Sequence, residues 1–489
     1  MRTGGLSLSG RGASAAALTL LFALVVLGVR LLLVAAYGNA TPSWDQWDGE
    51  ATGLYLPWLN GSLGWQQMLA PFNEHRLFAS RVLDLLLLEA NNRIWNCILQ
   101  MLADALLHVL ALSYLFFNLL KCCPEPRRPL FLLAALLLFC IPFGWENLLW
   151  GFQSQFYFLL LFSFFFIGGV STLEPLSWRW WLSVACGPLS ALSLASGVLT
   201  LGVGALIVAA RWLQRGRRHW PVPLVAAVLF GLALLAFKAT PFTRLSEVYR
   251  SHSPDQFFDA LNQVMSWPFL PWCVLVIYLP LGRFMIGQLR RPAPEQDPGW
   301  FLFGIGLWVF GQCVGIAYGR AAVVLSSRYQ DLLVLGLLLN VLCLLMQYRT
   351  IPGTGLRSRY RFYQLWLLIV ALGTGLEMPD IGRSIAYRAD SGQAQEAKLR
   401  AWLATSPPGP LQGKPAWDIP YPAIDDLVRF LETPAIRSIL PGNILPANQP
   451  RQPWLVTTLL AHLQALGTIC LLAGVLLSLR LLRTAPEAP

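Results

Sequence analysis

Charged residues are scarce in this 489-residue chain. Asp, Glu, Lys and Arg make up 12% of it, whereas hydrophobic residues make up 56%. A soluble protein of this length carries roughly twice that charged fraction. Apolar runs of about 18 residues recur from end to end, and the short alternating segments of a β-barrel are missing. The composition therefore predicts an all-α polytopic protein that lies in a lipid bilayer.

Motifs for nucleotide chemistry are missing as well. The sequence holds no P-loop, no Gly-rich nucleotide fingerprint and no regular metal motif. Its net charge of +11 comes with no nucleic-acid-binding motif, so no nucleic-acid partner is expected. The nine cysteines lie in or beside apolar runs or in one basic loop, which excludes an external disulfide scaffold.

The apolar runs predict about twelve transmembrane helices, and the first run is too long for a cleavable signal peptide. The predicted spans lie near residues 15–37, 94–119, 129–142, 153–171, 180–194, 197–211, 221–238, 268–282, 300–318, 331–347, 362–377 and 454–479.

Basic residues mark every second loop. They precede the first predicted span and follow the second, sixth, eighth, tenth and last ones, at Arg2, Arg11, Lys121, Arg127, Arg128, Arg211, Arg215, Arg217, Arg218, Arg283, Arg290, Arg291, Arg349, Arg357, Arg359, Arg361, Arg480 and Arg483. This alternation predicts that these loops and both termini are cytoplasmic. We therefore expect a multi-pass protein of the inner (plasma) membrane.

Three long segments lie on the predicted outer side, at residues 38–93, 239–267 and 377–453. The first holds an apolar run too short to span, among charged residues, which is typical of interfacial helices. The third is rich in proline. We predict a transmembrane module at residues 1–376, an outer (periplasmic) cap segment at 377–453, and a last transmembrane helix with a cytoplasmic tail at 454–489.

The stretch "SWDQWDGEA" places three carboxylates directly after the first predicted span. Asp45, Asp48 and Glu50 are candidate catalytic residues, because a carboxylate can act as a general base or hold a metal ion. The alternative is a solvated helix end with tryptophans anchored at the bilayer interface.

The stretch "PFNEHR" follows on the same side. Glu74, His75 and Arg76 are candidate substrate-binding residues, and a carboxylate beside an imidazole can bind a metal or relay a proton. A divalent metal, Mg or Mn, could involve Asp48, Glu74 and His75. The alternative for "PFNEHR" is a plain surface turn.

Two further stretches on the outer side are candidates for substrate contacts. "GWENLLWGFQSQF" sets Glu146, Gln153 and Gln155 among aromatic rings, as in sugar-binding surfaces, or else forms an aromatic belt.

"GRAAVVLSSRYQD" carries Arg320, Arg328 and Tyr329 where the topology rule requires no arginine. These arginines are suited to a lipid phosphate, and an Arg328–Asp331 ion pair is the alternative.

The second predicted span carries a polar stripe. Its members are four residues apart and share one helical face: Asn96, Gln100, Asp104 and His108. Polar side chains are costly against lipid, so the stripe is expected to face the bundle interior. It serves either hydrogen bonding between helices or a substrate path.

With a cytoplasmic N-terminus, a first span and an acidic outer loop, the chain resembles the C-type (GT-C) integral-membrane glycosyltransferases. "FNEHR", "WGFQSQF" and "TPAIRSILP" resemble stretches of uncharacterised bacterial multi-pass proteins assigned to that group. The resemblance implies a polyprenyl-phosphate sugar donor and a glycan, lipid or protein acceptor. It also implies a base at Asp45 or Asp48, with Glu146 as a second acid.

Two other functions remain open. A transporter or flippase for a lipid-linked or small polar substrate would use the stripe of the second span as its path. A non-catalytic protein of envelope polysaccharide assembly is the third possibility. An enzyme predicts a cavity beside Asp45 and Asp48 that opens outward only, whereas a transporter needs access from both sides.

Overall fold

A computed structural model describes residues 14–214, 221–241, 243–291, 296–347, 356–405, 411 and 418–483. The regular elements in these ranges are helices, and an isolated bridge between Phe72 and His75 is the one β feature there. Several of the predicted topology residues lie outside the described residues, namely Arg2, Arg11, Arg215, Arg217, Arg218 and Arg349.

Eight helices in the described ranges are long and apolar enough to cross a membrane, which confirms an all-α polytopic membrane protein. They are α1 (Ala15–Tyr37), α5 (Cys97–Leu120), α8 (Ser154–Thr172), α10 (Val198–Gln214, extended by the 3-10 turn η3, Ala195–Gly197), α15 (Gly299–Gly319), α16 (Ser327–Gln347), α17 (Leu356–Thr405) and α21 (Leu463–Arg483). Each coincides with one of the predicted spans.

The four other predicted spans coincide with shorter helices. These are α6 (Arg128–Cys140), α9 (Trp178–Ala191), α11 (Pro221–Lys238) and α14 (Val274–Arg290). Helices of 13 and 14 residues, such as α6 and α9, rise only about 20 Å, less than the roughly 30 Å hydrocarbon core. Twelve spans therefore stay a prediction.

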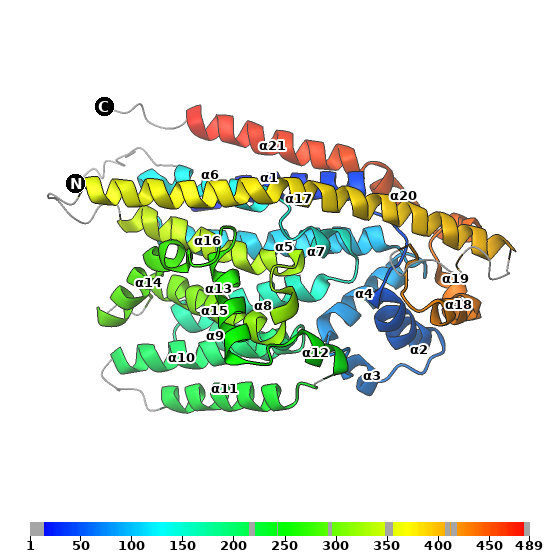
Figure 1. Ribbon diagram of the computed structural model, residues 1–489, viewed down its shortest axis with the longest axis horizontal. Helices are drawn as coiled ribbons and strands as arrows, with labels where there is room; N and C mark the ends of the chain where they lie inside the picture. Colours follow the sequence, from blue (N-terminus) through cyan, green and yellow to red (C-terminus); the bar gives the residue numbers. More distant parts are fainter. Residues whose placement is uncertain are drawn as a thin grey trace, which may run out of the picture.

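Short helices gather mainly at one end of the bundle (Figure 1). They are η1 (Gln46–Tyr55, a π-helix), α2 (Leu56–Leu59), α3 (Trp65–Leu69), α4 (Phe78–Ala90), α7 (Trp145–Leu149), α12 (Arg244–Tyr249), η4 (Ala321–Val323), α18 (Ile424–Glu432), α19 (Pro434–Ile439), η5 (Pro446–Arg451) and α20 (Trp454–Ala461). The remaining short elements are η2 (Glu125–Arg127) and α13 (Pro254–Ser266).

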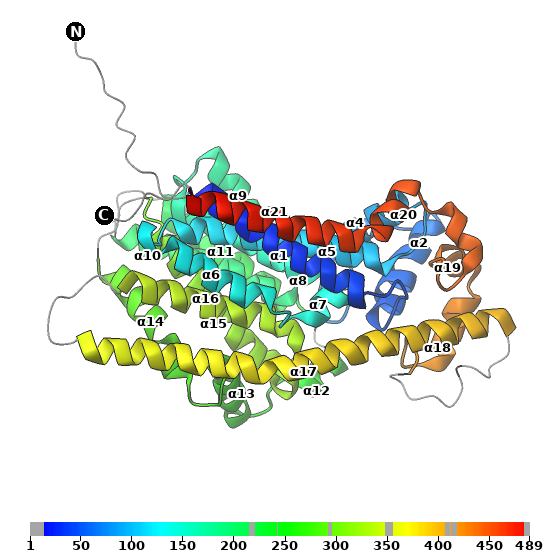
Figure 2. The ribbon, with the colours of Figure 1, turned by 90° about the horizontal axis from the view of Figure 1, so that it is seen from above.

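Residues 38–96, 395–405, 411 and 418–453 together form a cap on this end. Its buried core unites rings from both segments, including Trp47, Tyr55, Trp95, Trp402 and Phe430. α17 runs from the opposite end of the bundle to the cap as one 50-residue helix (Figure 2). The predicted boundary at residue 377 therefore lies inside a continuous helix. α1 begins and α21 ends at the end opposite the cap.

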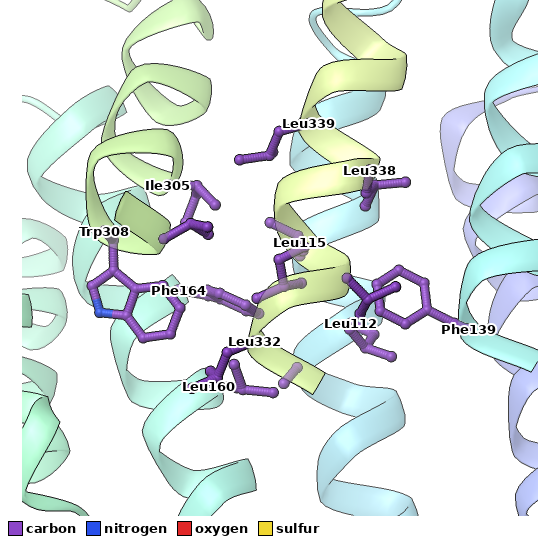
Figure 3. Close-up of a cluster of buried hydrophobic side chains, with 14 of the residues drawn as sticks. Leu112, Leu115, Phe139, Leu160, Phe164, Ile305, Trp308, Leu332, Leu338 and Leu339 are labelled. Carbon is purple, nitrogen blue, oxygen red and sulfur yellow. The ribbon is translucent and has the colours of Figure 1, made fainter. Parts of the chain in front are cut away.

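The bundle interior is filled by an apolar layer (Figure 3). It comprises Leu112 and Leu115 of α5, Phe139 of α6, Leu160 and Phe164 of α8, Ile305 and Trp308 of α15, and Leu332, Leu338 and Leu339 of α16. All ten side chains are buried. Toward the cap, the interior side chains become polar.

Candidate functional site: the acid–arginine junction

The π-helix η1 sets the position of the first acidic cluster. Its wide turns direct Trp47 into the cap core, where the indole packs edge-on against Trp95 at 5.4 Å. Asp45 and Asp48 stay half-buried at the rim. Trp44, just before them, has a φ of 54°, a left-handed backbone that non-glycine residues adopt at a cost of about 1–2 kcal/mol. Such strained residues often cluster at functional sites.

Asp48 has the electrostatic character of a general base. Burial raises its pKa to about 6, and a hydrogen bond from Tyr421 opposes the shift. The negative charges of Asp45 and Asp426 add to the rise. One carboxylate oxygen, Oδ1, is buried without a hydrogen-bond partner. A carboxylate with a pKa near the working pH, and with one oxygen free, is well suited to accept a proton.

Asp45 interacts electrostatically with both Asp48 and Arg328. Burial raises the pKa of Asp45, and the positive charge of Arg328, at the start of α16, opposes that shift. The Nη2 atom of Arg328 lies 3.7 Å from Oε1 of Glu146, while its Nε atom is buried without a partner. Arg328 is thus held loosely, with one donor unused. Within the described residues, Asp331 accepts from Asn147 at 2.9 Å and does not pair with Arg328.

The "PFNEHR" stretch brings a second ion pair to the same place. Glu74 pairs with Arg320 and accepts a hydrogen bond from Ser246 Oγ at 3.0 Å. Arg320 also donates from Nε to the Tyr329 hydroxyl at 3.1 Å. Because Arg320 and Glu74 already neutralise each other, the main role of Arg320 is to link η4 to the loop before α4.

His75 lies between the two arginine systems. Its Nε2 atom is 3.6 Å from Glu74 Oε1, and its Nδ1 atom accepts from the backbone N–H of Ala195 at 3.2 Å. Burial, aided by the charge of Arg328, lowers the His75 pKa to about 4. The imidazole is therefore neutral near pH 7. We refer to Asp45, Asp48, Glu74, His75, Arg320 and Arg328 as the acid–arginine junction.

Glu50 does not join the junction. It is 1% exposed, and its Oε2 atom accepts from Trp95 Nε1 and Gln100 Nε2, both at 2.9 Å. Gln100 Nε2 also donates to Asp84 Oδ1 at 3.0 Å. Burial and the neighbouring Asp84 raise the pKa of Glu50 well above its usual range, and burial raises that of Asp84 to about 7. This pair forms a separate polar centre beneath η1.

Three other predicted substrate-contact residues, Glu146, Gln153 and Gln155, form hydrogen bonds within the protein. Glu146 accepts from the hydroxyls of Ser326 (3.0 Å) and Ser327 (2.6 Å) and from the backbone of Arg328, which completes the start of α16. Gln155 donates to Gln153 at 3.1 Å, and both side chains are buried.

Arg76 donates to the carbonyls of Leu69 and Ala239, both at 3.0 Å. It therefore ties the loop before α4 to the end of α11, and this contact uses both of its terminal nitrogens.

The predicted metal ligands Asp48, Glu74 and His75 stay a prediction. In the described ranges, no group of three or more His, Cys, Asp or Glu side chains is placed to hold a metal ion. Glu74 is neutralised by Arg320, which opposes a second cation beside it.

Sequence reasoning missed three residues around the junction. Tyr421 reaches Asp48 from the cap, and Ser246 reaches Glu74 from α12. Arg388 of α17 donates to Ser43 Oγ at 3.1 Å and lies over the Trp150 ring at 5.1 Å. Their sequence separation from the partners exceeds 150 residues, so no local motif indicated them.

Comparisons with known proteins give no match: no family model, no curated protein and no solved structure is similar to this chain.

Proposed function

We propose that this protein is a membrane glycosyltransferase that moves a sugar from a polyprenyl-phosphate donor to a hydroxyl of a glycan, lipid or protein acceptor. The observation that carries the proposal is the arrangement of Asp48, Asp45 and Arg328. Asp48, whose pKa lies near 6, interacts with Asp45, and Asp45 lies within reach of the charge of Arg328, which has an unused donor, at the rim where the bundle meets the cap. A GT-C-like arrangement of about twelve spans is part of the proposal.

In the proposed reaction, Asp48 removes the proton from the acceptor hydroxyl. The oxygen attacks the anomeric carbon as the bond from that carbon to the phosphate oxygen breaks. The leaving polyprenyl phosphate gains negative charge, which Arg328 stabilises through charge-assisted hydrogen bonds. Asp45 orients Arg328 by its opposite charge.

The lipid donor follows from the proposed orientation. If the loops rich in basic residues are cytoplasmic, the junction faces the outer side of the inner membrane. Nucleotide sugars are not available there, so an activated sugar must arrive on a lipid. Phe152, whose ring packs against Gly49 and edge-on against Phe72 at 5.4 Å, supplies an aromatic surface beside η1.

The binding test compares two arginines with the same substitution. Arg328→Lys should weaken binding of polyprenyl phosphate to the full chain in lipid nanodiscs about tenfold or more, because lysine lacks the planar fork of guanidinium. Tenfold corresponds to roughly 1.4 kcal/mol. Arg320→Lys should weaken it less, since Glu74 and Tyr329 already occupy that side chain.

Arg429→Lys, on the exposed surface of α18, is the matched control and should leave binding unchanged. Circular dichroism and thermal unfolding check that each variant is folded. Equal binding by wild type and Arg328→Lys would remove the phosphate role of Arg328 and with it the main support for a lipid donor.

One observation favours a transporter as the second candidate. Gln100, Asp104 and His108 of α5 are buried inside the bundle, as a polar substrate path requires. Against it, Leu112, four residues beyond His108 on α5, belongs to the apolar layer of Figure 3. Uptake of labelled polyprenyl-linked sugar into proteoliposomes without transfer to an acceptor would favour the transporter.

A further inference from the structure

A column of polar side chains continues from the cap into the bundle. On α5, Gln100, Asp104 and His108 follow one another at intervals of four residues. Their exposed fractions are 3%, 0% and 0%. The stripe therefore faces the interior, and at about 1.5 Å per residue it extends some 12 Å along the helix.

Three other helices complete the column. Tyr157 of α8 stacks on His108, with ring centroids 4.4 Å apart. The positive charge of Arg30 on α1 acts on His108, and it acts on Asp331 of α16 as well. Arg30, Tyr157 and Asp331 are all buried. Side chains from four helices thus meet in one polar cluster.

Most polar atoms of this cluster have no hydrogen-bond partner in the described part of the chain. The unpaired atoms are both carboxyl oxygens of Asp104, both ring nitrogens of His108, the Tyr157 hydroxyl and Arg30 Nε. Native proteins leave few buried polar atoms unpaired, and internal water commonly satisfies those that remain. Inside a membrane bundle, such unpaired polar atoms are the groups that internal water would satisfy.

The two carboxyl groups of the cluster, Asp331 and Asp104, differ in the charges of their neighbours. Asp331 accepts from Asn147 at 2.9 Å and is close enough to Arg30 to feel its charge. The charged groups that act on Asp104 are Glu50 and Asp84, which are both acidic. An ionised carboxylate with no donor and two acidic neighbours is very unfavourable in a low-dielectric interior. Asp104 is therefore expected to hold a proton.

The polar column meets the buried acids Glu50 and Asp84 at its cap end and apolar side chains at its opposite end. Gln100 bridges Glu50 and Asp84 at the cap end, one helical turn from Asp104. At the opposite end, Leu112 lies one turn beyond His108, within the apolar layer (Figure 3). The other titratable or charged groups near the column are Tyr55, Arg81, Cys97 and Cys140.

We propose that Asp104 and His108 form a proton-binding site inside the bundle. It exchanges protons through internal water with Glu50 and Asp84 at the cap end, and the apolar layer seals it from the other end. The bound species is a proton, transferred between oxygen and nitrogen bases without any redox step. The occupancy of this site follows the pH on the cap side, independently of whether the junction performs sugar transfer.

The first test is infrared spectroscopy of the full-length protein in lipid nanodiscs. Wild type should show the carbonyl stretch of a buried protonated carboxylic acid, and this band should shift in D₂O. Glu50 and Asp84 are buried acids that absorb in the same region, so the Asp104 component is isolated as the difference between the wild-type and Asp104→Asn spectra. Asp104→Asn should lose that component, while Asp331→Asn, which alters a carboxyl group already bonded to Asn147, should keep it. The absence of a lost component in Asp104→Asn, or a lost component that does not shift in D₂O, overturns the proposal.

The second test is proton flux in proteoliposomes with a pH-sensitive dye inside. Because the apolar layer closes the column, a pH step across the bilayer should produce no steady flux above that of empty liposomes. A steady flux that Asp104→Asn abolishes would mean an open proton channel and would overturn the sealed site. Thermal unfolding of Asp104→Asn confirms that the variant is folded in both tests.

Discussion

Asp45 and Asp48 are three residues apart, yet their surroundings give them different chemical properties. Asp48 has an oxygen without a partner and a pKa of about 6, whereas Asp45 lies within reach of the positive charge of Arg328. The sequence left the base unassigned between them. In the proposed reaction, Asp48 is therefore the proton acceptor and Asp45 the residue that orients the arginine.

Asp48→Asn is therefore expected to lower the rate of sugar transfer about 100-fold or more, the usual contribution of a general base. The wild-type rate should also fall as the pH drops below about 6, because protonated Asp48 cannot accept a proton. Steady-state rates across a pH series, with radiolabelled polyprenyl-phosphate sugars as donors, measure both effects. Glu432→Gln, at an exposed position of the cap, serves as the control. An Asp48→Asn enzyme with the wild-type rate and pH profile would exclude Asp48 as the base.

The buried Glu50–Asp84 pair leads to a prediction about stability. Burial raises the pKa of Asp84 to about 7, while an unfolded chain has carboxyl pKa values near 4. Between about pH 4 and 7 the folded protein binds more protons than the unfolded one, so stability falls as the pH rises. This contribution is complete below about pH 4 and lost as the pH rises through about 7.

We expect the thermal unfolding midpoint of wild type to be lower at about pH 8 than at about pH 5. Asp84→Asn should reduce this difference, because asparagine can still accept from Gln100 but does not titrate. Intrinsic fluorescence of protein in nanodiscs follows the unfolding. Asp259→Asn, at an exposed site on α13, should keep the wild-type dependence. An identical pH dependence in wild type and Asp84→Asn would refute the role of the pair.

Residue types indicated which side chains gather at the site better than they indicated which of them pair. The candidate acids and arginines of the first and later loops do come together, as at Asp45 and Arg328. Glu146 and Arg320, however, serve largely as structural partners of Ser327 and Glu74. Such pairings join segments more than 100 residues apart, and local spacing carries no information about them.

At the scale of helices, close packing depends on single glycines. Gly28 of α1 faces α21 so closely that an added Cβ would lie 2.9 Å from the carbonyl oxygen of Gly467. The same atom would lie 2.8 Å from Leu471 Cγ. Small residues of this kind allow membrane helices to approach each other without a hydrophobic driving force. The buried residues of α21 are Leu463, Gly467 and Gly474, and two of these are glycines, so the close approach at Gly28 and Gly467 is expected to hold α21 on α1.

Gly28→Ala should therefore destabilise the protein by about 1–3 kcal/mol, the usual cost of overpacking. Gly375→Ala in α17 has open space around the added methyl group and gains helix propensity, so it should be neutral or stabilising by up to about 1 kcal/mol. Thermal unfolding of both variants in nanodiscs gives the comparison. If Gly28→Ala proves as stable as Gly375→Ala, the close contact of α1 and α21 is not important for stability.

Helix lengths were harder to predict than helix positions. Hydropathy located the eight long spans, because each carries an apolar run of sufficient length. It ended the eleventh span at residue 377, whereas α17 continues to Thr405. Polar residues beyond the apolar run cannot show whether a helix stops there or extends into the cap. Pro379, inside α17, does not end it either.

On the scale of the whole molecule, the sequence predicted a cap segment but not the core that it shares with the first outer segment. Its core joins η1, near the start of the chain, to α18 and α19, more than 370 residues later. The backbone N–H of Trp95 donates to the carbonyl of Ile439 at 2.7 Å, and that of Trp44 donates to Pro420 at 2.6 Å. The sequence indicates interfacial helices in the first segment and a proline-rich cap in the third, and neither pattern identifies the other segment as its partner, so their shared core emerges only from the tertiary contacts.

The orientation of the molecule is the last prediction, since the proposed lipid donor depends on it. Arg283, Arg290 and Arg291 are exposed on α14, away from the cap, whereas Asp425 and Glu432 are exposed on the cap. By the positive-inside rule, the cap should lie outside the cytoplasm. A cysteine placed by Glu432→Cys should react with an impermeant maleimide in spheroplasts. A cysteine placed by Arg291→Cys should react only after lysis.

The nine native cysteines are free thiols, so the unsubstituted chain gives the background for both variants. Equal labelling of the two sites after lysis shows that both are accessible, which makes the comparison in spheroplasts a measure of sidedness alone. If Arg291→Cys is the variant that labels in spheroplasts, the cap and the acid–arginine junction face the cytoplasm. Nucleotide sugars would then be available to the junction, and the reason for a polyprenyl-phosphate donor would disappear even if Asp48 is the base.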